Sequence, residues 1–112
     1  MRRLLLLAAV ALFSLPQLAA AKTFKDVPVV DSNCSKRVAS APDSHTRDCA
    51  LKCAGSGFGI LTSDNQYLKF DAEGNRQILQ QLKASHQTDH LRVNVDGDVH
   101  GDTLTVKSVK LL

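Results

Sequence analysis

The sequence predicts a mainly β domain: a small OB-like β-barrel of five antiparallel strands. A helix is expected between the third and fourth strands, and a short cysteine-bearing helix after the first. Apolar and polar residues alternate in 91–96 and 103–107, which is the period of a half-buried strand. Turn-forming residues at 63–65 and 96–102 indicate two hairpins. A helical pattern over 76–84 separates them, and this order favours the OB-like barrel over an α+β sandwich.

The first strand is expected within residues 22–32, where three valines cluster around Pro28. Proline has no N–H for a strand ladder, so this strand is predicted to be short or to lie at an edge. An irregular stretch follows, and then a helix over about 45–53. Asp43 or Ser44 is the expected N-cap of that helix, because a short polar side chain can accept bonds from the first backbone N–H groups.

The middle of the chain predicts a hairpin and then a helix. Residues 58–62 and 66–70 are the two strands of the hairpin, and 63–65 (Ser-Asp-Asn) form its turn. Asn75 is the expected N-cap of a helix over 76–84, whose apolar residues share one stripe. The last two strands then form the second hairpin.

Residues 1–21 have the layout of a secretory signal peptide. Two arginines follow the initial methionine, an apolar run covers 4–15, and small residues precede a cleavage point after Ala21. The apolar run is shorter than the ~20 residues needed to cross a bilayer. We therefore expect cleavage, a single domain over 22–112, a periplasmic or secreted location, and no stable membrane association afterwards.

Charge and composition narrow the expected partners. The net charge of +3 falls to about +1 once the two arginines of the signal are removed, and only 4% of residues are aromatic. A nearly neutral domain lacks the basic footprint of a nucleic-acid-binding protein. We therefore expect no nucleic-acid partner, and an unknown protein or small ligand instead.

One combination of segments is similar to a known group. It comprises His45–Gly59 (HTRDCALKCAGSGFG), YLKFD at 67–71, LRVNV at 91–95 and GDTL at 101–104. This combination resembles an uncharacterised group of small exported bacterial proteins with a His-x3-Cys-Ala-x2-Cys segment, an SGFG-type turn and a C-terminal hairpin. The resemblance covers most of the chain after the signal. It implies an exported, β-rich, OB-like domain and implies no activity.

Three cysteines and one histidine form the cluster with the most chemistry to offer. His45, Cys49 and Cys53 are spaced four apart, which places them on one face of a helix, and Cys34 lies in the irregular segment before it. Thiolates and imidazole are ligands for Cu(I) or Zn(II). The candidate metal ligands are therefore Cys34, His45, Cys49 and Cys53.

A disulfide is the alternative use of the same cysteines, and it is the one we favour from the sequence. In an oxidising compartment, Cys34 paired with Cys49 or Cys53 would stabilise a small domain by about 2–4 kcal/mol. The third thiol would then be unpaired. A thiol-redox protein is a third, less favoured, use of these cysteines.

Two functions follow from these alternatives. The first is an exported binding or interaction module, stabilised by a disulfide and without a cofactor. The alternative is a periplasmic protein that binds copper or zinc through the cysteine and histidine cluster. A catalytic cysteine needs a base that a third residue orients, and no orienting residue is evident beside His45 and Cys49. We therefore expect no enzymatic activity.

Overall fold

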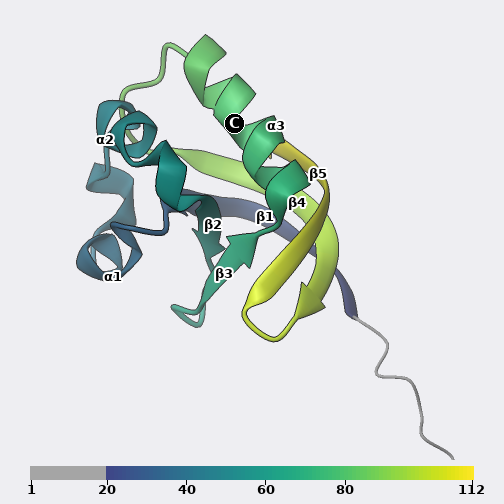
Figure 1. Ribbon diagram of the computed structural model, residues 1–112. Coiled ribbons are helices and arrows are strands. Elements are labelled where there is room, and N and C mark those ends of the chain that lie inside the picture. Colours follow the sequence, from purple (N-terminus) through teal and green to yellow (C-terminus); the bar gives the residue numbers. More distant parts are fainter. Residues whose placement is uncertain (1–19) are drawn as a thin grey trace, which may run out of the picture.

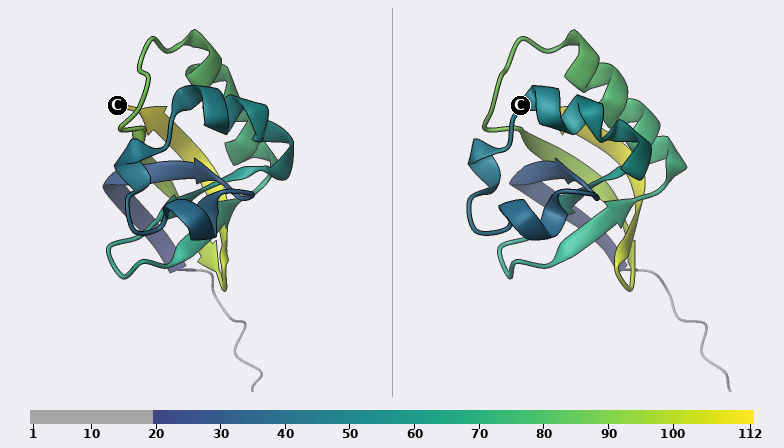
Figure 2. Two further views of the ribbon diagram at one scale, coloured as in Figure 1. Left: turned by 90° about the vertical axis from the view of Figure 1, so that its left-hand side faces the viewer. Right: turned by 60° about the vertical axis from the view of Figure 1, so that its left-hand side comes forward.

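The computed structural model describes residues 20–112, which form a five-stranded closed barrel (Figure 1). The strands lie in the order β1-β2-β3-β5-β4. The elements are β1 (Ala20–Asp31), α1 (Ser35–Val38), η1 (Pro42–Ser44), α2 (Arg47–Lys52), η2 (Ala54–Ser56), β2 (Phe58–Leu61), β3 (Tyr67–Phe70), α3 (Ala72–Ala84), β4 (Arg92–His100) and β5 (Thr103–Leu111). The short helices α1 and α2 gather on one side, in the connection between β1 and β2 (Figure 2).

The strand directions differ from the prediction in one respect. The expected barrel of five strands is confirmed, as is the helix between the third and fourth strands. The expectation that all strands are antiparallel was wrong, because β3 and β5 run parallel, with Lys69 opposite Thr103 and Phe70 opposite Leu104. After β3, the chain passes through α3 and β4 before β5 returns beside β3 in the same direction.

β1 is not short, which corrects a second expectation: it has 12 residues and lies between β4 and β2 in the barrel, although each part of it pairs on one side only. Its first part pairs with β4 and its last part, from Val29, pairs with β2. Pro28 occupies the last pair with β4, opposite Arg92. The ladder is already irregular between Phe24 and Val27, and proline is tolerated in a sheet beside such a bulge.

The predicted signal peptide lies mostly outside the described residues, which begin at Ala20. The predicted cleavage point, after Ala21, falls inside β1, where Ala20 and Ala21 pair with Val99 and Asp98. Within the described part of the chain, no helix is long and apolar enough to cross a membrane.

α3 begins four residues earlier than predicted, because Asp71 caps it instead of Asn75. Asp71 Oδ1 accepts hydrogen bonds from Gly74 N and Val106 N, both at 3.1 Å, so one carboxylate caps the helix and anchors β5. Asn75 instead accepts a bond from Phe58 N at 2.8 Å, at the start of β2. Together these side chains hold α3 against the barrel. The buried core consists of Val29, Ala50, Phe58, Ile60, Leu68, Phe70, Ile78, Leu82, Leu91, Val93, Val95, Leu104, Val106 and Val109.

Candidate metal centre

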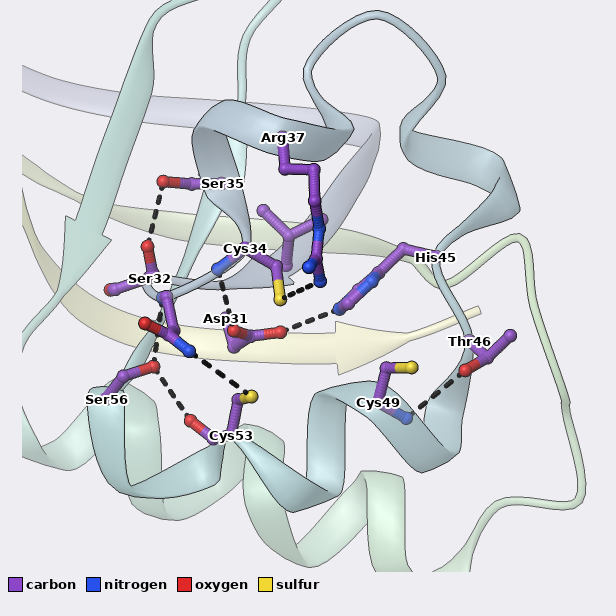
Figure 3. A network of polar contacts seen from close by, with 12 residues as sticks. Asp31, Ser32, Cys34, Ser35, Arg37, His45, Thr46, Cys49, Cys53 and Ser56 are labelled. Carbon is purple, nitrogen blue, oxygen red and sulfur yellow. Dashed lines mark hydrogen bonds and ion pairs between the residues drawn. The ribbon is translucent and has the colours of Figure 1, made fainter.

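A buried carboxylate, Asp31, stands at the end of β1. Val29 and Val30 before it are core residues, and Asp31 itself is 0% exposed. Its Oδ1 accepts a hydrogen bond from His45 Nε2 at 2.7 Å, and its Oδ2 accepts one from Cys34 N at 3.0 Å (Figure 3). A buried charge needs such partners. Both partners come from the connection between β1 and β2, and both are buried.

Cys34 is the N-cap residue of α1 and is 3% exposed. Burial raises the pKa of its thiol, and the neighbouring Asp31 carboxylate raises it further. Arg37, one turn along α1, opposes this rise and donates from Nη2 to Cys34 Sγ at 3.0 Å. In the metal-free protein, Cys34 therefore favours the protonated form. A bound metal ion would displace that proton.

The predicted helix over 45–53 is shorter than expected and begins later. Thr46 caps α2 by accepting a bond from Cys49 N at 3.2 Å, whereas Asp43 and Ser44 lie in the separate turn η1. His45 therefore precedes the helix in extended conformation, and Cys53 is the C-cap residue. The expectation that His45, Cys49 and Cys53 share one helical face was wrong. Threonine is also a favoured N-cap residue, so the helix begins after Thr46.

The structure brings together a different group of donor atoms from the one predicted. A carboxylate oxygen of Asp31 and the sulfur atoms of Cys34 and Cys53 all lie within 4.8 Å of one another. His45 joins this group through Asp31 rather than as a direct member. Cys49 is exposed and lies outside it. Figure 3 shows the sulfur of Cys53, the C-cap residue of α2, directed toward the segment that carries Cys34.

The predicted disulfide is not formed in this structure. Cys34, Cys49 and Cys53 are all free thiols. Cys34 and Cys53 are nonetheless neighbours, since their sulfur atoms belong to the same group of donors. Of the two pairings expected from the sequence, the structure places Cys34 beside Cys53 and leaves the thiol of Cys49 exposed.

Each of the three donor side chains has a polar partner of its own. His45 contacts Asp31, Arg37 contacts Cys34, and Asn33 Nδ2 lies 3.6 Å from Cys53 Sγ. The position of Asn33 is fixed in turn, because its backbone N–H donates to Ser56 Oγ at 3.1 Å. Such outer partners orient metal ligands and tune their basicity.

Tyr67 fixes the segment just after Asp31. Its hydroxyl lies 2.9 Å from Ser32 Oγ and 3.2 Å from the Val30 carbonyl oxygen. Burial raises the pKa of Tyr67 to about 12, although the Ser32 contact works in the opposite direction. β3 thus holds the end of β1 in place beside the cluster.

Asp31 is the site residue that sequence reasoning missed. No metal motif contains it, because it was hidden at the end of a valine-rich strand. One signal pointed to it: an acidic residue that directly follows Val29 and Val30, three positions before Cys34. Acidic residues are almost never fully buried unless they are paired. An aspartate in a core strand therefore predicts a polar partner.

A groove of 480 Å³ lies apart from the cluster, between the first part of β1 and the turn that joins β2 to β3. Its walls include β1 residues 22–28 and turn residues 62–66, with Leu68 and Val99 among its apolar lining. Among the described residues 20–112, the part of β1 along 20–28 pairs with β4 only. The other edge of β1 faces this groove, and no strand of the described part of the chain pairs with it there.

The fold and the cluster define a small β-barrel domain with a buried thiol and carboxylate site beside its first strand. Comparisons with protein-family models, with curated proteins and with solved structures found no match to this chain.

Proposed function

We propose that this protein is a small exported OB-like domain that binds a Zn(II) ion through Asp31, Cys34 and Cys53. One observation carries the proposal: the three donor side chains, from the end of β1, from α1 and from the end of α2, meet within 4.8 Å. Tetrahedral Zn–S bonds of ~2.3 Å place two sulfur atoms about 3.8 Å apart. Closure around an ion therefore requires only small side-chain movements.

The donor set favours Zn(II) over Cu(I). Thiolates bind both ions, but a carboxylate oxygen suits zinc and not the softer Cu(I). Charge points the same way. Two thiolates and one carboxylate carry three negative charges, which a dication and the Arg37 guanidinium beside Cys34 offset. Three protein ligands leave a fourth coordination position for water or another ligand.

Two broader parts of the proposal rest on other features. The OB-like assignment is supported by the strand order β1-β2-β3-β5-β4, the parallel β3–β5 pair and the helix between β3 and β4. Export is supported by the signal-like composition of residues 1–21. In place of the predicted disulfide, the bound ion would link the α1–α2 segment to the barrel.

Metal uptake by the reduced protein tests the proposal. Exported protein is reduced, freed of metal with a chelator and titrated anaerobically with Zn(II), and bound metal is measured by elemental analysis after gel filtration. We expect about one equivalent of zinc. Cys34→Ser and Cys53→Ser should each lower the affinity at least tenfold, and Asp31→Asn should also weaken binding.

Cys49→Ser is the matched control, because it removes a thiol of the same helix that lies outside the cluster. Its zinc affinity should stay within about twofold of the parent protein. Co(II) substitution adds a second readout, since thiolate ligands give a charge-transfer band that both cluster variants should weaken. Equal losses in Cys49→Ser and Cys53→Ser would refute the assignment, as would no uptake by the reduced protein.

The groove beside β1 favours a second candidate function, the binding of an extended peptide. A strand edge with one free side can accept another strand through backbone hydrogen bonds, while side-chain pockets select the sequence. The β1 edge along 22–28 and the apolar residues Leu68 and Val99 offer both elements. This corresponds to the binding-module hypothesis drawn from the sequence.

A short synthetic peptide of alternating threonine and valine tests this second candidate. Added to the isotope-labelled protein, it should slow amide hydrogen exchange within residues 22–28 and leave exchange in α3 unchanged. The control is a peptide of the same length with a central proline, which cannot donate to the ladder. Equal effects of the two peptides, or no protection at millimolar concentration, would exclude strand addition at this edge.

A further inference from the structure

Cys34 and Cys53 are also placed to form a disulfide, in addition to binding a metal ion. Cys34 Sγ and Cys53 Sγ lie within 4.8 Å of each other, and Asp31 supplies the third donor atom of the group. A disulfide needs sulfur atoms about 2.05 Å apart, so the two sulfur atoms must move closer together for the bond to form. The residues come from different segments, so the bond would cross-link the start of α1 to the end of α2.

Their exposures differ, and this sets an order of reaction. Cys34 is 3% exposed, whereas Cys53 is only partly buried. A disulfide that arrives from solvent therefore meets Cys53 first, and the Cys53 thiolate is the first attacking group. Arg37 Nη2, 3.0 Å from Cys34 Sγ, is placed to stabilise negative charge on the second sulfur when it reacts in turn.

We propose that Cys34 and Cys53 form a dithiol–disulfide couple that exchanges with small-molecule disulfides, and that this oxidation releases the metal ion. The release of the metal ion rests on the proposed zinc function, because the same two sulfur atoms would bind zinc in the reduced protein and form the disulfide in the oxidised protein. The exchange with small-molecule disulfides does not rest on it, since exchange requires only the two thiols. The substrate class is an aliphatic disulfide, R–S–S–R.

The reaction balances in two steps of thiol–disulfide exchange. The Cys53 thiolate attacks one sulfur of R–S–S–R, a mixed disulfide forms, and the first RS⁻ leaves and takes up the proton that Cys53 released. Cys34 then attacks Cys53 Sγ, and the second RS⁻ leaves with the proton from Cys34. Two electrons pass from the protein thiols to the small disulfide, which gives two R–SH and one protein disulfide.

The test uses 2-hydroxyethyl disulfide as the probe and the Cys49→Ser protein as the background, because exposed Cys49 would otherwise form an adduct of its own. Reactions of metal-free protein are quenched with acid and measured by intact mass. We expect a loss of about two mass units and no lasting adduct. Adding Cys34→Ser should trap the mixed disulfide on Cys53, whereas adding Cys53→Ser should leave Cys34 at least tenfold slower to react.

Zinc-loaded Cys49→Ser protein tests the regulatory part separately. Bound Zn(II) should slow oxidation at least tenfold, and one ion should be released for each disulfide formed, as read with a chromophoric chelator. Cys34→Ala serves as a second variant if Cys34→Ser does not fold, as judged by circular dichroism. Stable adducts without disulfide formation would overturn the couple, and full oxidation with zinc still bound would overturn the release.

Discussion

Removal of the His45 imidazole should destabilise the fold strongly, because it leaves the Asp31 carboxylate buried with a single strong partner. Asp31 is 0% exposed and His45 5%, and Nε2 and Oδ1 lie 2.7 Å apart. Breaking a buried pair by removing one partner costs about 3–5 kcal/mol. Domains of this length have free energies of unfolding of roughly 5–14 kcal/mol. His45→Ala should therefore remove a large part of the stability and lower Tm by more than about 10 °C.

Urea unfolding of reduced, metal-free protein measures this cost at neutral pH. The matched control is His90→Ala, because His90 Nδ1 also lies 2.9 Å from a carboxylate, that of Asp89, but both side chains are exposed. Exposed pairs contribute about 0–1 kcal/mol, so the control should change little. A cost below about 1 kcal/mol for His45→Ala would show that the carboxylate does not depend on this contact.

A double-mutant cycle separates the pair from the cavity that the missing ring leaves. Asp31→Asn keeps an oxygen that can accept from Cys34 N but carries no charge, so it removes the need for His45. The double variant Asp31→Asn, His45→Ala should then cost less than the sum of the single variants, by about 1–3 kcal/mol. Simple additivity would refute the pairing.

Three further predictions concern the barrel around the site. Tyr67, the chain's one tyrosine, should ionise near pH 12 in the folded protein and near its ordinary pKa of 10 in urea, as followed by ultraviolet absorbance. Because its folded pKa is raised, the stability it adds is complete below pH 10 and is lost between pH 10 and about 12, and equal midpoints would contradict its burial. Asp71→Ala should cost about 2–4 kcal/mol in urea unfolding, since it removes the cap of α3 and the acceptor for Val106 N, and a loss below about 0.5 kcal/mol would exclude the double role. Gly59→Ala would place a Cβ 2.3 Å from the Leu68 carbonyl oxygen, so it should lower Tm by more than about 8 °C, and an unchanged Tm in calorimetry would contradict the close strand approach.

The number and type of the main elements could be predicted from the sequence because each has a local cause. The alternation in the last two strands and the stripe in α3 are properties of single segments, and the structure confirms both elements. The parallel pairing of β3 and β5 is different, because it depends on how α3 and β4 return the chain. The period of a strand identifies its buried face but carries no information on the direction of its neighbour.

Part of the site could be predicted from the sequence. Cysteines are candidate ligands wherever they occur, and two of the predicted ligands, Cys34 and Cys53, belong to the observed group. The start of the helix was predicted wrongly. The two expected N-caps lie before His45, whereas the residue that caps α2 is Thr46, which follows His45. Because the helix begins after His45, the imidazole does not lie on the helical face with the cysteines, and it contacts Asp31 instead. A single change in cap residue thus converted an expected ligand into the partner of an unexpected one.

The cluster lies in the connection between β1 and β2, which the barrel core stabilises only weakly. This connection, residues 32–57, contains only short helical pieces, α1 contributes no buried residue, and α2 contributes only Ala50. Helices of four to six residues are unstable on their own, so packing or cross-links must hold them. The hydrogen bonds of Asp31 with Cys34 N and His45 Nε2 tie this connection to the end of β1. A metal ion or a disulfide between Cys34 and Cys53 would close the same connection near its other end, so either state would stabilise a segment that contributes few residues to the hydrophobic core.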